Sequence, residues 1–390
     1  MSYPERAGTY VSAYGPRTFK PRDLPPSDPP ISFDQELRDL QADAMGALKK
    51  LEGLAEVIPN LDHFIGMFMR KESLLSSQIE GTQASFDDVL FSEGQDLSKV
   101  RSDVREVLNY RKALYHGLNR VREIPFSLRL LKEVHSILVE GVRGHQRNPG
   151  QFRTSPNWIG GPGSTIDTAE FVPPAVPDML DSLSSFERYY HEGVEYPLIK
   201  CGLLHAQFET IHPFYDGNGR IGRLLVSFFL CEQGILDRPL LYLSYYFKRY
   251  RQEYYDSLMA VRHEGNWEGW LKFFLVGMVQ VSKMSVDTAK RLLTLETADR
   301  NRIKAASTSA NALALHDLLL TLPVISAQTV VQRLNVSYPT ALHQIELLEN
   351  MEIIREVTGQ PRNRRWVYDQ FTKIMSEGTA IANYDKEKAN

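Results

Sequence analysis

"HPFYDGNGRIGR", residues 212–223, lies between two apolar stretches and decides how the rest of the chain is interpreted. The flanking residues 198–211 and 223–234 are apolar on most sides, as is typical of helices buried in a bundle. The glycines of G-N-G at 217–219 let backbone N–H groups converge at the start of the second helix, where the helix dipole favours an anion. The stretch therefore predicts a turn between two buried helices that binds an anion.

Charged and titratable side chains surround this turn. Arg220 and Arg223 are spaced to share one side of the first helical turn, where both can bind phosphate oxygens. Asp216 is placed as a single carboxylate ligand for Mg²⁺, which completes its octahedron with phosphates and water. His212 is expected at the exposed end of the preceding helix, titrating near neutral pH as a general base. The combination predicts nucleotide phosphate chemistry, whereas glycines and arginines alone would indicate a helix cap.

Composition limits the class of protein. At 390 residues the chain is too long for one compact core and predicts about two or three domains. The net charge of −3 gives no global electrostatic argument for nucleic acid or membrane as partner. Cys201 and Cys231 lie in apolar runs, which predicts a reduced, cytoplasmic protein with two buried thiols. The longest apolar run, residues 224–231, is far too short to cross a membrane.

Apolar periodicity and the placement of proline and glycine divide the chain into six segments. They are an extended, Pro-rich arm at 1–32, an N-terminal helical region at 33–100, a helical core at 101–295, a linker at 296–310, a small separate unit at 311–371, and a tail at 372–390. The helices expected after residue 60 are 63–81, 101–122, 127–141, 176–192, 196–211, 221–233, 251–263 and 266–295. The linker is assigned because it is polar and low in large aliphatic residues.

The quoted stretch resembles the Fic-domain motif, H-x-F-x-[D/E]-G-N-G-R-x-x-R, with every specified position filled. The resemblance implies a mainly α fold, in which a Fic helical core carries a short β-hairpin flap. It also implies transfer of AMP from ATP onto a Tyr, Thr or Ser hydroxyl of a protein target. His212 would then take the hydroxyl proton, Phe214 would pack the loop into the core, and Asp216 would hold Mg²⁺ between the α- and β-phosphates.

The same resemblance assigns the nucleotide-binding residues. They are Gly217, Asn218, Gly219, Arg220, Ile221, Gly222 and Arg223, with the two arginines on the β- and γ-phosphates. A related branch, the Doc toxins, transfers a phosphoryl group and carries Lys at the position of Gly219, so the glycine favours nucleotidyl transfer here. Removal of AMP and transfer of another phosphate group, such as phosphocholine, stay open.

Two further segments resemble parts of Fic proteins. Residues 150–164, with 171–174, resemble the flap hairpin that pairs with the backbone of the target, and Ile159 would be its apolar tip. An irregular loop is the alternative. Tyr254 and Tyr255 fall in the region that borders the adenine, and Tyr255 is the better candidate. Core packing is the alternative for each tyrosine.

The segment "SSQIEGT", residues 76–82, contains S-x-x-x-E-G. Ser76 and Glu80 are four apart, so on a helix they share one face. Together with the Fic motif, Ser76, Glu80 and Gly81 resemble the inhibitory helix [S/T]-x-x-x-E-[G/N]. The resemblance implies that Glu80 pairs with Arg223 and displaces the γ-phosphate, so the enzyme would inhibit itself. Positioning a water for AMP removal is the alternative role of Glu80.

Residues 311–371 predict helix, helix, longer helix and two short strands, which is the order of a winged helix-turn-helix domain. Its expected DNA contacts are Tyr338, Thr340, His343 and Gln344 in the major groove, and Arg362, Arg364 and Arg365 on phosphate. The unit is not strongly basic, because its five arginines face six acidic residues. DNA binding and protein docking or dimerisation therefore both stay open.

The combined expectation is a self-inhibited protein adenylyltransferase that uses ATP and Mg²⁺. Its partner is a protein target with a hydroxyl side chain, with DNA as a second candidate partner, a homodimer suggested by the family, and no membrane. A DNA-binding regulator whose Fic unit only senses nucleotide is the alternative, although sensing alone would not need the base His212.

Overall fold

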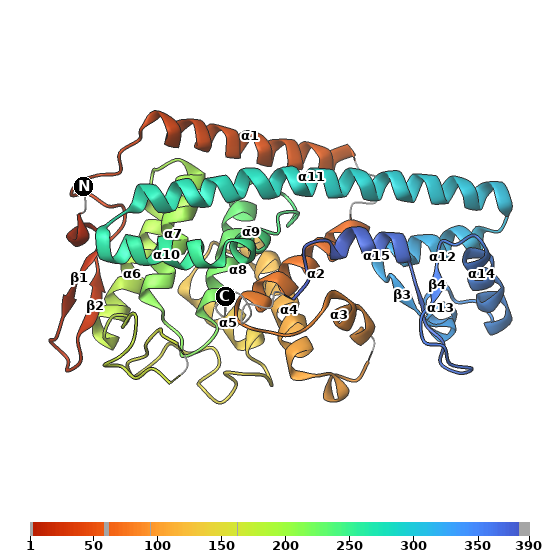
Figure 1. Cartoon of the computed structure of the whole chain (residues 1–390), viewed down its shortest axis with the longest axis horizontal. Coiled ribbons are helices and arrows are strands. Elements are labelled where there is room, and N and C mark those ends of the chain that lie inside the picture. Colours follow the sequence, from red (N-terminus) through yellow and green to blue (C-terminus); the bar gives the residue numbers. More distant parts are fainter. Residues whose placement is uncertain (1–2, 58–61, 94, 162, 382–390) are drawn as a thin grey trace, which may run out of the picture.

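The computed structural model describes residues 3–57, 62–93, 95–161 and 163–381, which form a mainly helical protein (Figure 1). The first half contains η1 (Pro4–Arg6), β1 (Gly8–Val11), β2 (Thr18–Pro21), α1 (Gln35–Val57), α2 (Asp62–Ile79), α3 (Phe86–Ser92), η2 (Leu97–Lys99), α4 (Ser102–Glu123), α5 (Leu128–Leu138) and α6 (Val176–Glu192). The second half contains α7 (Pro197–Ile211), α8 (Asn218–Glu232), α9 (Ser244–Arg249), α10 (Arg251–Glu264), α11 (Trp267–Ala306), α12 (Ala310–Thr321), β3 (Val324–Ile325), α13 (Ala327–Leu334), α14 (Tyr338–Asn350), β4 (Arg355–Glu356), β5 (Trp366–Val367) and α15 (Asp369–Ser376).

Helix α7 is the centre of the core. Every residue from Leu198 to Ile211 is buried, because the helix has no polar face to turn toward solvent. Helices α6, α8, α10 and α11 pack around it, and α8 also packs on α4. The expected helices from 176 to 263 are confirmed to within a few residues, so the quoted motif does join two buried helices.

Helix α2 is buried along almost its whole length, although it carries many polar residues. From Met67 to Ile79 every side chain is buried. It crosses the molecule between the core around α7 and α8 and the C-terminal unit, and it packs against α4, α9, α12 and α15 (Figure 1). A polar helix enclosed on all sides must find partners for its polar groups within the protein.

The expected linker at 296–310 is wrong for most of its length. Helix α11 continues to Ala306 without a break, and only three residues separate it from α12. The reason is a stripe of buried residues, Glu296, Asp299 and Ile303, at helical spacing. Two of the three are polar, and the hydroxyl of Tyr368 donates to Asp299 at 2.8 Å. Residues 296–306 are therefore polar because this part of α11 packs through hydrogen bonds as well as apolar contacts.

The N-terminal arm is a β-hairpin packed on the core. Strands β1 and β2 pair antiparallel, with Gly8 opposite Pro21. The arm is fixed to the core by the backbone N–H of Phe19, which donates to Val172 O at 2.9 Å. The expected flap hairpin is reduced to a single antiparallel bridge, in which Ile159 and Phe171 exchange hydrogen bonds of 2.8 and 3.1 Å. Residues 1 and 2 of the arm and residue 162 of the flap lie outside the described residues.

The C-terminal unit has the expected order of helices and strands. Helices α12, α13 and α14 are followed by β4 and β5, and the small sheet has the order β3-β5-β4, with both pairs antiparallel. The winged-helix arrangement is therefore confirmed. The tail was expected to follow at 372–390, but α15 and residues 377–381 pack against the rest of the protein, and residues 382–390 lie outside the described part. The other domain boundaries stay predictions.

Among the described residues, no helix has both the length and the apolar character needed to span a bilayer.

Candidate functional site

The motif loop is held in shape by its own side chains. Helix α7 ends at Ile211, and the residue that caps it, His212, has a left-handed backbone at φ 49°. The side chain of Asn218 bonds the backbone of Phe214 in both directions, at 2.8 and 2.7 Å. Phe214 is fully buried and stacks on His135 with ring centres 3.9 Å apart, as the resemblance implies. The loop therefore presents a fixed shape to whatever binds beside it.

His212 sits beside the loop with its ring oriented by the backbone. Its Nδ1 lies 3.4 Å from Glu209 O, which leaves Nε2 free to accept a proton if Nδ1 carries the hydrogen. Burial, assisted by the charges of Arg262 and Arg153, lowers the pKa of His212 to about 3. The expected titration near neutral pH is therefore wrong. The imidazole is neutral, the form a base needs, across the physiological range.

The G-N-G segment opens α8 as expected. Gly217 is left-handed at φ 82°, and α8 begins at Asn218. A Cβ added to Gly219 would lie 2.4 Å from Glu80 Oε1, so the carboxylate of Glu80 rests directly over the backbone of the first turn of α8. A helix N-terminus stabilises an anion, and here that anion is the carboxylate of Glu80, the residue that follows α2.

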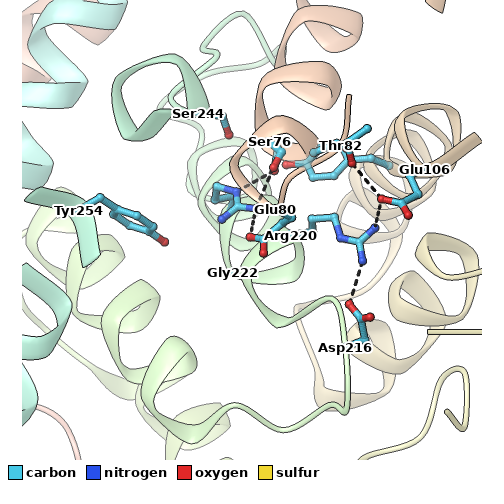
Figure 2. A network of polar contacts seen from close by, with 12 residues as sticks. Ser76, Glu80, Thr82, Glu106, Asp216, Arg220, Gly222, Ser244 and Tyr254 are labelled. Atoms are coloured by element: carbon cyan, nitrogen blue, oxygen red, sulfur yellow. Dashed lines mark hydrogen bonds and ion pairs between the residues drawn. The ribbon is translucent and has the colours of Figure 1, made fainter. Parts of the chain in front are cut away.

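Arg223 is buried, and its side chain bonds to Ser76 of α2 and to Glu80 just beyond that helix. Its Nε donates to Ser76 Oγ at 2.7 Å, and its Nη2 donates to Ser76 O at 3.0 Å and to Glu80 Oε1 at 2.7 Å (Figure 2). Burial acts to raise the pKa of Glu80, but the neighbouring charge of Arg223 outweighs it, so the pKa of Glu80 is lowered. The ion pair that the resemblance implies is therefore present. Gly81 follows Glu80 in the left-handed region, at φ 93°, where α2 has ended.

Arg220 differs from expectation. It is fully buried and does not point to the same partners as Arg223. Its guanidinium lies between two carboxylates, 3.1 Å from Asp216 and 3.6 Å from Glu106 (Figure 2). Thr82 Oγ1 donates to Glu106 at 3.0 Å, so this network reaches back to the residue just beyond the inhibitory motif. A buried cation requires anionic neighbours, and these two carboxylates supply them.

Asp216 is the only motif carboxylate at the loop. One oxygen faces Arg220, and the other lies 3.4 Å from Nε of Arg143, whose side chain is half exposed. Within the described part of the chain, no three His, Cys, Asp or Glu side chains gather as a metal-binding group. A single partly exposed carboxylate fits Mg²⁺ that arrives with ATP, because Mg²⁺ takes one or two protein carboxylates and keeps phosphates and water as its other ligands.

The structure places Tyr254 and Tyr255 in different surroundings. Tyr254 is buried in the aromatic core, where its hydroxyl lies 2.9 Å from His205 Nε2 and its ring stacks on Phe247. This placement favours the alternative of core packing, and a role at the adenine stays a prediction. Tyr255 is partly buried, and the charges of Glu80 and Arg223 both act on its hydroxyl. It therefore remains the candidate for the nucleotide pocket. Ile221 and Gly222 lie buried within α8.

The flap segment is anchored to the motif by Arg153. This side chain is 1% exposed, and it donates to His212 O at 3.0 Å and to Pro174 O at 2.5 Å. Ile159 is partly buried, whereas its neighbour Trp158 is exposed. Arg153 thus joins the backbone of His212 to both sides of the flap segment.

Sequence reasoning missed four charged residues that shape this site. They are Glu72, Glu106, Arg143 and Arg153. Glu72 had a signal, because it continues the four-residue spacing of Ser76 and Glu80. It is buried, and it accepts from Tyr110 Oη at 3.1 Å and from the backbone N–H of Ser244 at 3.1 Å. The two arginines come from a loop dense in basic residues, "GVRGHQRNPGQFR" at 141–153, but nothing in that loop indicated their partners.

The residues of the C-terminal unit that were expected to contact DNA differ in their exposure. Tyr338 is 52% exposed and His343 is exposed, but Gln344 is buried and its expected groove contact is wrong, because it lies on the inner side of α14. Tyr338, Arg362 and Arg364 line a groove of about 700 Å³ between the wing and the starts of α13 and α14. Arg365 also borders this groove, but its Nη1 donates to Phe91 O at 2.6 Å, which ties the wing to α3.

Known protein families match most of the chain. The Fic/DOC family N-terminal domain matches residues 38–119, the Fic/DOC family domain matches 125–230, and an HTH DNA binding domain matches 313–367. The chain is 27% identical to a probable protein adenylyltransferase of Aquifex aeolicus over 45% of its own length, and 28% identical to the protein adenylyltransferase Fic of Drosophila yakuba over 43%. It spans about half of the first relative, 52%, and 31% of the second.

Solved structures support the fold. A Fic family protein from Desulfovibrio desulfuricans aligns with a TM-score of 0.56 at 19% identity, covering 87% of this chain and 98% of that one. A Fic domain containing signaling protein from Bacteroides thetaiotaomicron aligns with a TM-score of 0.50 at 18% identity, covering 66% and 97%. At these identities the likeness concerns the fold alone.

Proposed function

Since the chain belongs to the Fic/DOC family, we propose that it is a self-inhibited protein adenylyltransferase, which transfers AMP from ATP to a Tyr, Thr or Ser hydroxyl of a protein target. The observation that carries the proposal is the placement of His212 beside the N-terminus of α8. Its Nδ1 faces Glu209 O while a backbone anion site lies next to it. A base and a phosphate-binding turn are the two parts that this transfer requires.

In the reaction, the target hydroxyl loses its proton to Nε2 of His212 and its oxygen bonds to the α-phosphorus. The bond from the α-phosphorus to the bridging oxygen breaks, and diphosphate leaves with that oxygen. The backbone N–H groups at the start of α8 stabilise the negative charge of the phosphates. Asp216 would hold Mg²⁺, whose charge neutralises the phosphates when it is bound. Gly219 in place of the lysine of the Doc branch supports nucleotidyl over phosphoryl transfer.

Self-inhibition is part of the proposal. Glu80 occupies the anion site of α8 and engages Arg223, which would otherwise bind the γ-phosphate. A carboxylate in this place repels the phosphates of ATP and removes the arginine from them. ATP would then bind only in a pose from which transfer is slow. Movement of α2 away from α8 would free both groups together.

Labelling separates adenylyl transfer from its alternatives. The Glu80→Gly chain is incubated with host lysate and ATP that carries the label either on the α- or on the γ-phosphate. Protein label from the α-position only is expected, and mass spectrometry then identifies the modified residue. Label from the γ-position would indicate phosphoryl transfer, and no label from either would refute the proposal. His212→Ala should abolish labelling, whereas His343→Ala, at an exposed histidine far along the chain, is the matched control.

DNA binding by the C-terminal unit is a second proposed function. The groove beside Tyr338, Arg362 and Arg364 favours it, because arginines at the wing suit phosphate contacts. A gel shift with genomic DNA fragments tests it, with Arg362→Ala as the variant expected to weaken binding. A homodimer stays a prediction from the family resemblance, and protein docking or dimerisation stays the alternative role of this unit.

The cytoplasm is the proposed location. ATP as substrate supports it, and so do two free thiols, because unpaired cysteines are typical of reducing compartments. The expectation of two buried thiols is confirmed for Cys201, whereas Cys231 is only partly buried. Burial raises the pKa of Cys231 to about 12, which keeps it protonated.

A further inference from the structure

The inhibitory helix α2 is held from two opposite sides. Ser76 and Glu80 face Arg223 on α8. Gln78 lies between them in sequence, and at about 100° per residue it points to the opposite side of the helix. Its side chain is nevertheless buried, so something covers the back of α2 as well.

The cover is formed by the C-terminal segment, residues 377–381. Gln78 Nε2 donates to Thr379 O at 3.0 Å and also to Ala84 O at 3.0 Å. Lys248 Nζ donates to Gln78 Oε1 at 2.6 Å and to Ala380 O at 2.5 Å. The amide of Gln78 is thereby bonded through both its nitrogen and its oxygen. Gln78, Lys248 and two backbone carbonyls of the C-terminal segment form one closed set of hydrogen bonds behind the inhibitory motif.

The segment is fixed to α11 at its beginning. Glu377 receives two hydrogen bonds from Arg291, at 2.7 and 2.6 Å, and both side chains are about half exposed. Gly378 follows at φ 75°, where an added Cβ would lie 2.3 Å from the ring of Tyr245. Only glycine lets the backbone pass this close to the tyrosine with that conformation. The path of the segment toward Gln78 is therefore set by a surface ion pair and one glycine.

These contacts couple the C-terminal segment to the inhibitory ion pair. Glu80 lies one residue beyond the end of α2, so a movement of the last helical turn that separates Glu80 from Arg223 also displaces Gln78. That displacement breaks the bonds of Gln78 to Thr379 O and to Lys248. While the C-terminal segment is bound, the last turn of α2 can move only if the Glu80–Arg223 pair and the hydrogen bonds of Gln78 break together.

We propose that the C-terminal segment holds the inhibitory helix closed, and that its detachment raises adenylyl transfer. The inference rests on the proposed function and adds a regulatory element to the same site. The segment continues directly from α15, which packs on α2 through Phe371 against Phe64, so its position follows that of the C-terminal unit.

Charge reversal at the exposed ion pair tests the proposal without substituting a residue of α2 or of the active site, although the charges of Glu377 and Arg291 both act on Lys71 of α2. Glu377→Arg and Arg291→Glu each replace attraction by repulsion, and the double variant restores an opposite-charge pair. An exposed pair is worth up to about 1 kcal/mol, so each single variant should raise auto-AMPylation by about fivefold and the double variant should return toward the wild-type rate. Lys373→Glu is the matched control, because it reverses an exposed lysine on α15 and breaks its pair with Asp369 instead.

The Glu80→Gly chain in the same assay marks full release. If it labels strongly while the single reversals stay at the wild-type rate, the C-terminal segment does not hold α2 and the inference is overturned. If Glu80→Gly itself gives no label, the proposed function fails, and hydrogen exchange decides the coupling separately. Faster amide exchange over residues 72–82 in Glu377→Arg than in the control supports the coupling, and unchanged exchange overturns it.

Discussion

Replacing Glu80 by glycine should release the site, and the structure gives the size of the effect. The substitution removes one charge-assisted hydrogen bond, 2.7 Å long, between an arginine side chain that is 2% exposed and a carboxylate that is 27% exposed. Such a bond contributes about 1.5–3 kcal/mol net. Arg223 keeps its two bonds to Ser76, so the cation is not left without partners. At about 1.4 kcal/mol per factor of ten, the rate of transfer should rise by about 10- to 150-fold.

The assay is the initial rate of auto-AMPylation with α-labelled ATP and magnesium, at ATP concentrations below saturation. Glu80→Gln should give an intermediate rate, because the amide fills the same place over Gly219 without the charge. Ser76→Ala removes the other side-chain partner of Arg223 and should raise the rate less than Glu80→Gly. Glu123→Gly is the matched control, since it removes an exposed glutamate that ends α4 and pairs with Arg120.

A rate for Glu80→Gly equal to that of the wild type, with ATP bound in both, would refute the reasoning. It would mean that the pairing with Arg223 does not compete with the phosphates. A high rate for Glu80→Gln equal to that of Glu80→Gly would instead show that charge alone, and not the space occupied over α8, is what blocks the nucleotide.

Three further predictions concern buried groups. Burial lowers the pKa of His212 to about 3, so labelling by the Glu80→Gly chain should stay level from about pH 8 to about 5.5, and a loss of half the rate near pH 6.5 would contradict this. Tyr254→Phe should cost about 1 kcal/mol of unfolding free energy and leave ATP affinity in calorimetry unchanged, whereas Tyr255→Ala should weaken ATP. Burial raises the pKa of Glu209 to about 7 from 4.5, so its stabilising contribution is complete below about pH 4.5 and is lost as the pH rises through 7. Denaturant titrations should show that Glu209→Gln flattens this fall, and an unchanged pH dependence would contradict it.

The sequence predicted the parts of the fold and site that depend on local pattern. Apolar periodicity places α7 and α8 because burial on all sides requires a continuous apolar run. The spacing of Ser76 and Glu80 places them on one face of α2 for the same geometric reason. Their pairing with Arg223 came from the family resemblance, since nothing local connects residues so far apart in the chain.

The parts that failed depend on contacts between distant segments. Residues 296–306 look like a linker because Glu296 and Asp299 are polar. Their burial depends on partners that a linker composition does not indicate, such as the hydroxyl of Tyr368, which donates to Asp299. Gln344 was assigned to the outer face of α14, but the packing of the small unit turns it inward. The pairing of Arg220 with Glu106 on another helix was likewise not indicated by the sequence, and its role at the phosphates stays a prediction.

The length of α11 fixes where the C-terminal unit lies relative to the helical core around α7. At about 1.5 Å per residue, its 40 residues form a rod of about 60 Å along which α1 lies (Figure 1). Inserting one residue into the part of α11 that extends beyond the core would rotate the C-terminal unit by about 100° about the helix axis. The contacts of the C-terminal segment with Gln78 would then be lost. Seven residues would nearly restore the facing side but shift it by about 10 Å. Relatives that keep this arrangement should therefore tolerate substitutions on the outer face of the rod and few insertions or deletions within it.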